Sequence, residues 1–221
     1  RIKTKSKEKI HEKLTCDIID KSNEIRKYIS EDKRRKIIDL ISGIHHQEPI
    51  VRNIVSGPLD ADKLDYLLRD SYFCGVKYGI YDIERLIGTL VEHTEESGDK
   101  SLAANDDGIY AIEQFVLAKY HLSMQVYRHK IRLVTDAMIV RALELGIEKD
   151  KLPWLIRLYK YDGTLQHLDE YLQWDDCRVI NQLLYSGEKK GAATDIFQRL
   201  KERRLFKRVF SKLVVDIDPP I

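Results

Sequence analysis

The sequence predicts an all-α protein: a mainly helical bundle with one small β-hairpin and an extended C-terminal segment. Apolar residues recur at helical spacing along most of the chain. Glycine and proline, at 11 and 5 of 221 residues, are too few for an all-β or fibrous protein. A hydrophobic content of 43% with a net charge of only +2 excludes a disordered chain.

The first helices are delimited by their apolar spacing and by their ends. Residues 8–19 carry isoleucine and leucine at helical intervals, and a second helix runs from Ser30 to Gly43. Gly57-Pro58 interrupts the chain ahead of a helix over 59–73, and Asp82 begins another that continues to Ile87.

The pattern changes between Gly88 and Asp107. Two β-prone runs, 89–93 and 101–104, flank Ser97-Gly98-Asp99, which predicts a hairpin. Residues 109–145 contain no glycine or proline, so we expect one very long helix. Its predicted apolar stripe consists of Tyr120, Met124, Tyr127, Ile131, Val134 and Met138.

The last third of the chain completes the helical bundle. Four helices are predicted over 152–161, 164–173, 175–186 and 193–203, and the β-branched stretch 206–216 is expected to be extended. No internal repeat or low-complexity linker separates these segments.

Composition also limits the function classes. No apolar run approaches the roughly 18 residues of a membrane span, and the first 13 residues are charged rather than signal-like. The cysteines at 16, 74 and 177 are far apart and form no CxxC, which excludes a disulfide framework or thiolate zinc site and favours a reducing, cytoplasmic setting. With 38 basic against 36 acidic residues, nucleic-acid binding finds little support.

The segment 59–70 is the most informative for chemistry. On a helix, Asp62, Lys63, Tyr66 and Asp70 fall within about a quarter of the circumference, opposite the leucines. Two carboxylates, a phenol and an ammonium on one surface suit a hard metal ion with a sugar-phosphate ligand. The alternative is a solvated face supported by ion pairs of Asp62 and Asp65 with Arg69.

The same segment resembles a known enzyme family. The run DADKLDYLLRDS at 60–71, followed by Gly75-Val76 and DIERLI at 82–87, is similar to the C-terminal signature of HD-superfamily phosphohydrolases. The branch it resembles is that of the dGTPase-like deoxynucleoside triphosphate triphosphohydrolases. The resemblance continues through YRHK at 127–130 and LKERRLFK at 200–207, so it covers nearly the whole chain.

This resemblance implies a role for each matched residue. Asp62 would be a metal ligand, Lys63 would meet the triphosphate, and Tyr66 and Asp70 would hold the deoxyribose. Tyr127 would pack against the sugar and disfavour a 2′-hydroxyl. The remaining implied residues are Lys119 as a cation near phosphate, His11 as a catalytic histidine assisting proton transfer, and Arg203 and Lys207 as binders of a regulatory nucleotide.

One family feature is missing from the sequence. The family draws three metal ligands from a histidine and a later His-Asp doublet, yet no His-Asp dipeptide occurs here. His45-His46 is interpreted as a loop, because adjacent residues point apart and no third ligand follows at i+4. The doublet would precede Arg1, so either an N-terminal segment is absent or this is a non-catalytic member. The start at arginine favours the former.

The resemblance gives the expected organisation and activity. Residues 1–146 would be the C-terminal majority of an HD-type catalytic domain, and 147–221 a helical subdomain packed on it. The intact protein would hydrolyse deoxynucleoside triphosphates to deoxynucleoside and triphosphate with Mn²⁺, Mg²⁺ or Fe, as a homo-oligomer without a membrane partner, whereas this chain alone would be inactive. The alternatives are a non-catalytic nucleotide-binding or oligomerisation module, and an HD phosphohydrolase acting on another nucleotide or phosphate ester.

Overall fold

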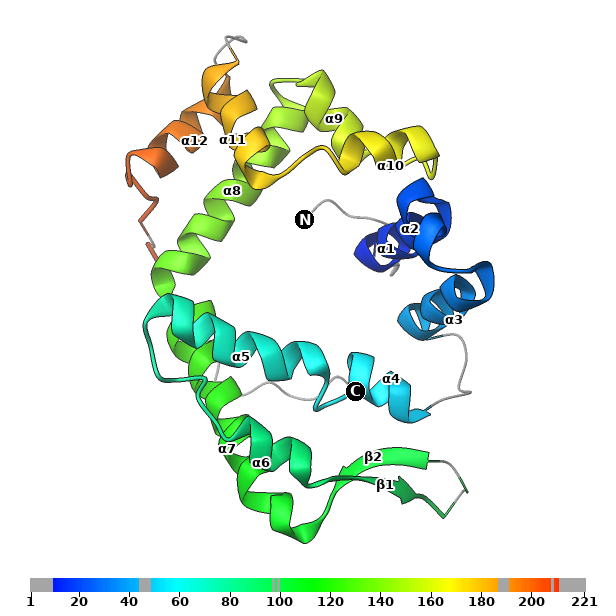
Figure 1. The fold of residues 1–221 in the computed structure, drawn as a ribbon. Helices are drawn as coiled ribbons and strands as arrows, with labels where there is room; N and C mark the ends of the chain where they lie inside the picture. The colour runs from blue at the N-terminus through cyan, green and yellow to red at the C-terminus, as the bar shows by residue number, and fades with distance from the viewer. Residues whose placement is uncertain are drawn as a thin grey trace, which may run out of the picture. The chain divides into compact units, whose positions relative to one another are not determined.

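The structure is a computed structural model that describes residues 10–43, 49–96, 98, 100–186, 191–207 and 209–210. These residues form helices and one two-stranded antiparallel sheet, which confirms the predicted all-α class (Figure 1). The chain divides into two compact units, considered separately below: Arg1–Arg128 with Asp162–Leu172, and His129–Tyr161 with Gln173–Ile221.

The first unit begins with a small helical layer. Its members are α1 (Ile10–Lys21), α2 (Asn23–Tyr28), α3 (Glu31–Ser42) and, from later in the chain, α10 (Leu165–Tyr171). Helix α1 packs against both α3 and α10, and Lys21 Nζ donates to Gly163 O at 2.8 Å. Helix α3 ends as predicted at Gly43, whose φ of +66° is the left-handed conformation that favours glycine.

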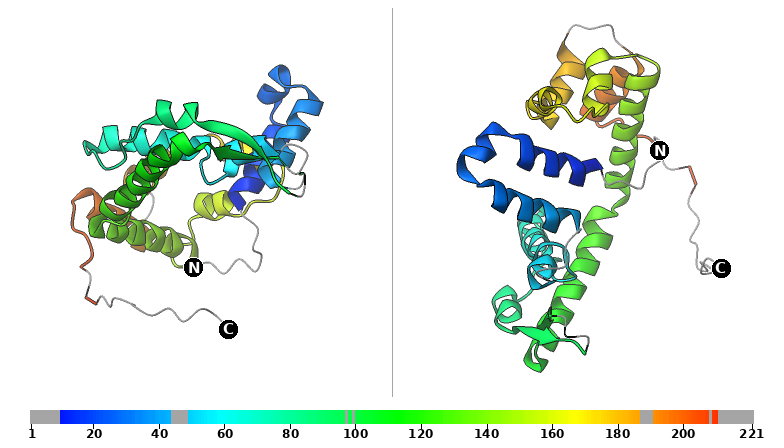
Figure 2. Two further views of the ribbon diagram at one scale, coloured as in Figure 1. Left: turned by 90° about the horizontal axis from the view of Figure 1, so that it is seen from below. Right: turned by 90° about the vertical axis from the view of Figure 1, so that its right-hand side faces the viewer.

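The rest of the first unit surrounds the central helix α5 (Ala61–Cys74). The other elements are α4 (Pro49–Ser56), α6 (Ile83–Gly88), β1 (Leu90–Thr94), β2 (Lys100–Ala104), a 3₁₀ turn (Asp106–Gly108) and α7 (Ile109–Leu122). The two strands pair Leu90 with Ala104 through to Thr94 with Lys100, so the hairpin prediction is confirmed, and β2 packs against α4 (Figure 2).

The core of the first unit lies between α5, α6 and α7. Leu67, Leu86 and Leu122 are fully buried, and Phe115 joins them from α7. The loop after α5 can approach that helix because residue 79 is glycine: a Cβ there would lie 2.4 Å from both Leu67 O and Ser71 Oγ. This close approach carries Tyr81 into the core, where its ring packs edge-on against Phe115 at 5.4 Å.

The expectation of a single long helix over 109–145 is wrong. Helix α7 ends at Leu122 and passes into a π-helical turn (Ser123–Tyr127), in which Arg128 N donates to Ser123 O at 2.8 Å. A new helix, α8 (Lys130–Glu148), then starts at His129, whose ring nitrogen accepts from Ile131 N at 3.4 Å. Because an i→i−5 turn contains more residues than an α-turn, the helical period is lost without glycine or proline.

The predicted apolar stripe is also wrong, because most of its members are not buried. Tyr120 and Met124 are 58% and 45% exposed, whereas the buried face of α7 consists of Ala111, Phe115, Ala118 and Leu122. Of the six predicted members only Met138 is buried. The stripe assumed one uninterrupted α-helical period, which the π-turn breaks.

The second unit contains α8, α9 (Pro153–Tyr159), α11 (Asp176–Tyr185) and α12 (Ala192–Lys201). Its core includes Met138 and Ala142 from α8, Leu183 from α11, and Ala193 and Phe197 from α12. Asp150 links α8 to the start of α12, because its two carboxylate oxygens accept from Ala192 N at 3.0 Å and Ala193 N at 2.8 Å.

The boundary between the compact units differs from the predicted division of the chain, and two predicted segments lie wholly or mostly outside the described residues. The predicted division between residues 146 and 147 lies inside α8, whereas the compact units separate at residues 128 and 129. His45-His46 and most of the stretch predicted to be extended lie outside the described residues. Within the part of the chain that the structure describes, no helix is both long and apolar enough to cross a membrane.

Candidate functional site

Helix α5 positions the candidate site, and both of its ends are fixed locally. Asp60 caps the helix by accepting from Lys63 N at 2.8 Å, and Gly75 ends it with a φ of +66°. Leu64, Leu67 and Ser71 are buried along one face. The row Asp62, Tyr66 and Asp70, spaced by four residues, therefore lies on another face, as the sequence predicts.

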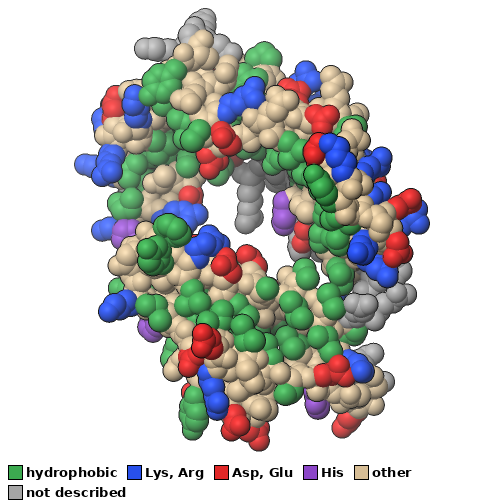
Figure 3. All heavy atoms as spheres, viewed as in Figure 1, with side chains coloured by type: hydrophobic (Ala, Val, Ile, Leu, Met, Phe, Trp, Pro, Cys, Tyr) green, Lys and Arg blue, Asp and Glu red, His purple; other side chains and the backbone are tan. Residues whose placement is uncertain are grey.

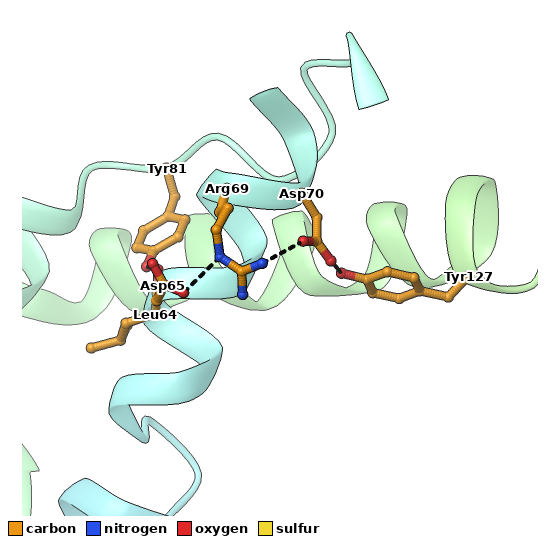
Figure 4. A network of polar contacts seen from close by, with 6 residues as sticks. All are labelled: Leu64, Asp65, Arg69, Asp70, Tyr81 and Tyr127. Atoms are coloured by element: carbon orange, nitrogen blue, oxygen red, sulfur yellow. Dashed lines mark hydrogen bonds and ion pairs between the residues drawn. The ribbon is translucent and has the colours of Figure 1, made fainter. Parts of the chain in front are cut away.

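Three of the predicted site residues are brought together. Tyr127, at the last position of the π-turn, donates its phenolic hydrogen bond to Asp70 Oδ2 at 2.5 Å (Figure 4). Its ring meets Tyr66 edge-on, with 6.1 Å between ring centres. All three side chains are partly exposed, so a phenol–carboxylate cluster is open to a ligand on this surface.

Arg69 occupies the other side of Asp70. Its Nε donates to Asp65 Oδ2 at 2.9 Å, and its Nη1 lies 3.5 Å from Asp70 Oδ1 (Figure 4). Each oxygen of Asp70 therefore has one partner within the protein. Since an ionised carboxylate can accept about four hydrogen bonds, Asp70 retains acceptor capacity for a ligand hydroxyl.

Tyr81 packs against the buried side of α5. Its phenol donates to Leu64 O at 2.7 Å inside the core, within a turn of Asp65 (Figure 4). Burial, together with the nearby Asp65 carboxylate, raises the pKa of Tyr81 to about 12. This tyrosine remains a neutral donor at physiological pH and holds the helix turn that carries Asp65.

The two tyrosines of the site are also held neutral. Burial raises the pKa of Tyr127 strongly, and the hydrogen bond to Asp70 raises it further because the phenol donates to a carboxylate. Burial likewise raises the pKa of Tyr66, although Lys63 opposes this shift. At neutral pH both side chains can donate hydrogen bonds and present aromatic surface, but they carry no charge.

Lys63 is engaged by the start of its own helix. Its Nζ donates to Gly57 O at 2.9 Å and forms an ion pair with Asp60, and its side chain is 25% exposed. The sequence places this lysine beside Asp62 and Tyr66, and the structure adds that it neutralises the capping carboxylate. Its expected contact with phosphate stays a prediction.

The other predicted residues lie on different elements. His11 is exposed on α1, which packs against α3 and α10, and Lys119 is half-buried on α7. Arg203 and Lys207 are exposed and belong to the second unit. None of these four side chains takes part in the Tyr66–Asp70–Tyr127 contacts.

The described residues alone do not fit a catalytic metal site. Asp62 is exposed on α5, as a metal ligand would have to be. Among the residues that the structure describes, however, no group of three or more histidine, cysteine, aspartate or glutamate side chains could hold an ion. A single carboxylate does not bind a divalent ion tightly.

Tyr81 and the capping role of Asp60 were not anticipated from the sequence. An aspartate two residues after Pro58, at the start of a helical pattern, is a typical N-cap, which was available as a signal. No local sequence pattern indicated the role of Tyr81, because its hydrogen bond to Leu64 joins residues that are 17 positions apart. The Asp65–Arg69 pair follows i,i+4 spacing and matches the expected ion pairing.

Comparisons with known proteins identify the family of the chain. A family model described as HD associated region matches residues 81–219. The chain is 23% identical to the Bacillus subtilis protein YwfO over 90% of its length and 47% of that protein. It is 25% identical to the Danio rerio deoxynucleoside triphosphate triphosphohydrolase SAMHD1, covering 72% of this chain and 25% of that protein.

A solved structure shares the fold. The crystal structure of a phosphohydrolase from Bacteroides thetaiotaomicron matches with a TM-score of 0.63 and 25% identity, over 83% of this chain and 48% of that one. The chain therefore spans about half or less of the length of the proteins it matches.

Proposed function

The chain belongs to the HD-associated region family, and from this premise we propose that the intact protein hydrolyses deoxynucleoside triphosphates to deoxynucleoside and triphosphate. The similarity to SAMHD1, which is named a deoxynucleoside triphosphate triphosphohydrolase in Danio rerio and, for its homologue, in Dictyostelium discoideum, supports this substrate class. The similarity to a phosphohydrolase structure supports hydrolysis of a phosphoester.

The observation that carries the proposal is the cluster of Tyr66, Asp70 and Tyr127. Asp70 retains lone pairs that can accept the 3′-hydroxyl of a deoxyribose, while both tyrosine rings offer apolar surface for its face. The hydrogen bond to Asp70 fixes the Tyr127 ring, so this ring can occupy the space that a 2′-hydroxyl would need. Such a site would bind deoxyribose in preference to ribose.

The phosphate end of the substrate would lie toward Asp62 and Lys63. Lys63 would exchange its contact with Asp60 for the triphosphate, and Lys119 would add a second cation. His11 would assist proton transfer at the phosphoester. These three assignments rest on the family resemblance.

A divalent ion, Mn²⁺, Mg²⁺ or Fe, would be bound by Asp62 together with ligands from the part of the intact protein that this chain does not contain. Such an ion, when bound, polarises the phosphate and activates water. Because the described residues alone do not complete its site, we assign no reaction step to it.

The proposal is tested by product analysis. The intact protein is incubated with each deoxynucleoside triphosphate, alone and in mixtures, with Mn²⁺ or Mg²⁺. Release of inorganic triphosphate is the expected result. Release of single phosphates would indicate a different HD phosphohydrolase, and binding without turnover would indicate a non-catalytic module. Turnover that occurs only in mixtures would support an activating nucleotide, for which the family resemblance implies Arg203 and Lys207. A mass measurement in solution tests the expected homo-oligomer.

Replacing Asp62 gives the sharpest single-residue test. We expect Asp62→Ala in the intact protein to abolish turnover, because it removes a metal ligand, and to lower the amount of divalent metal retained after gel filtration. Glu84→Ala, which removes an exposed carboxylate from α6, serves as the matched control and should keep wild-type turnover. Wild-type activity in Asp62→Ala would contradict the assignment.

A further inference from the structure

The second unit contains a groove that the proposed hydrolysis at α5 does not use, although Arg203, which lines it, is also one of the two residues that the family resemblance implies for a regulatory nucleotide. It lies between α8, α11 and α12, with a volume of about 560 Å³. This volume falls in the range of small-molecule binding sites, roughly 300–1,000 Å³. Ile131, Thr135 and Ile139 form one wall at successive turns of α8, which makes the groove about 12 Å long.

The lining of the groove is almost entirely apolar. Leu184, Phe197 and Leu200 face Ile139 from α11 and α12. Of the two hydroxyls present, Thr135 Oγ1 donates to Ile131 O at 3.0 Å, whereas Tyr185 OH accepts from Lys201 Nζ at 2.6 Å and keeps its own hydrogen to donate. Apart from this hydroxyl and the two cations, the lining offers a base or sugar few partners for its donors and acceptors, which disfavours a nucleotide in the groove.

Two cations belong to the lining of the groove. Lys201 and Arg203 line it, and among its described lining residues none is acidic. Glu202, which lies between them in sequence, is engaged by Gln198 and Arg204 at 2.6 Å each. The groove therefore combines a largely apolar lining with an excess of positive charge.

Arg203 holds its position at a conformational cost. Its φ is +55°, in the left-handed region where glycine is favoured. The backbone there forms the pair of bonds that ends many helices, with Arg203 N donating to Leu200 O at 3.0 Å and Arg204 N to Arg199 O at 2.8 Å. Lys151 has the same φ of +55°, so the conformation alone assigns no role to Arg203; its place in the lining of the groove does.

We propose that this groove binds an amphipathic anion with a linear hydrocarbon chain, of the fatty-acyl carboxylate class. The chain would lie along α8 between Ile139 and Leu184, and its carboxylate would meet Arg203 and Lys201. Charge complementarity and the shortage of free hydrogen-bonding groups in the lining both select this ligand class. The site is separate from α5, so this proposal and the proposed hydrolysis can fail independently.

The test measures binding to the intact protein by calorimetry. Dodecanoate is the probe, dodecanol is the neutral match and butanoate is the short anionic match. We expect dodecanoate to bind, with affinity falling by about fourfold for each buried methylene removed. No binding of dodecanoate, or equal binding of dodecanol, would overturn the proposal. So would displacement of bound dodecanoate by a deoxynucleoside triphosphate, since the groove would then be a nucleotide site.

Four variants separate binding from folding. Thr135→Trp fills the groove and should abolish binding, with its helical circular dichroism retained. Arg203→Gln and Arg203→Gly should each weaken binding by about fivefold. Only the glycine variant should raise the unfolding midpoint, because it relieves the left-handed backbone. Lys149→Gln removes an exposed charge of the same unit that does not line the groove and should bind normally. Unchanged binding in both Arg203 variants would refute the role of that residue.

Discussion

At the scale of single residues, Asp70 is the most constrained group of the candidate site. It accepts from Tyr127 through one oxygen and faces Arg69 through the other, so its orientation is set before any ligand arrives (Figure 4). Preorganised acceptors of this kind bind ligands without paying the entropy of ordering their own side chains. The phenol of Tyr127 is therefore as important to the site as the carboxylate.

The role of the Tyr127 phenol can be tested by comparing its removal with the removal of the Tyr81 phenol in the same unit. Tyr127→Phe and Tyr81→Phe each delete one donated hydrogen bond, so both should lower the free energy of unfolding by about 1 kcal/mol. Only Tyr127→Phe should also raise the KM for deoxynucleoside triphosphates, because Tyr81 lies beneath α5 and contacts no proposed ligand. Urea denaturation and steady-state kinetics measure the two effects. An equal change of KM in both variants would contradict the proposed site.

The raised pKa of Tyr127 also predicts a pH dependence. The folded protein keeps this phenol protonated above its ordinary pKa of 10.0, whereas the unfolded chain releases the proton near that value. The stabilisation by Tyr127 should be complete below pH 10 and decline as pH rises above it. The difference in unfolding free energy between wild type and Tyr127→Phe, measured by urea denaturation from pH 8 to 11, should therefore be constant at first and then decrease. A difference that grows above pH 10 would contradict this linkage.

At the scale of elements, the link between α8 and α12 depends on one carboxylate. Asp150 accepts from the first two backbone amides of α12, and a Cβ at residue 191 would lie 2.4 Å from its Oδ2. We expect Asp150→Ala to lower the free energy of unfolding by about 1–2 kcal/mol, since it leaves amides without an acceptor at a helix N-terminus. Thermal unfolding measures this. Glu148→Ala, an exposed carboxylate two residues away, should stay within about 0.5 kcal/mol of wild type.

At the scale of the whole chain, each compact unit has its own core. Leu122 is fully buried in the first unit and Met138 in the second. Truncating either residue to alanine should cost about 2–5 kcal/mol. Hydrogen exchange should show that Leu122→Ala speeds exchange in α5 and α7, and that Met138→Ala speeds it in α8 and α12. Faster exchange across both units in each variant would show that they unfold together.

The exposed surfaces also belong to this scale. Figure 3 shows apolar side chains over α5 and its neighbouring helices, with acidic and basic side chains among them. Tyr72 and Phe73 at the end of α5 are 81% and 78% exposed and pack edge-on against each other.

Most of the fold could be predicted because its signals are local. Apolar spacing, N-caps such as Asp82 and Thr164, and the glycine at 43 act within a few residues, and the corresponding helices form where expected. Helix α4, which no capping pattern marked, was missed. The π-turn was missed as well, because no residue type in 123–127 excludes an α-helix.

The site could be predicted only in part, because some of its contacts join segments that are far apart in the sequence. Helical geometry alone placed Asp62, Tyr66 and Asp70 on one surface. The contact of Tyr127 with Asp70 spans 57 residues and depends on how α5 packs against α7, so it was not predicted; the family resemblance indicated only that both residues would contact the sugar. Tyr81 and the groove between α8, α11 and α12 are likewise products of packing between distant segments.

The π-turn at 123–127 has a consequence for insertions and deletions. Such a turn is equivalent to one extra residue inserted into an α-helix, so an in-frame loss of one codon, for example that of Gln125, would convert this stretch to ordinary α-helical pitch, while the break at His129 would remain. Tyr127 would then rotate by about 100° around the helix axis, away from Asp70. This stretch, which reads as an unremarkable helix, is where a change of length would be least tolerated.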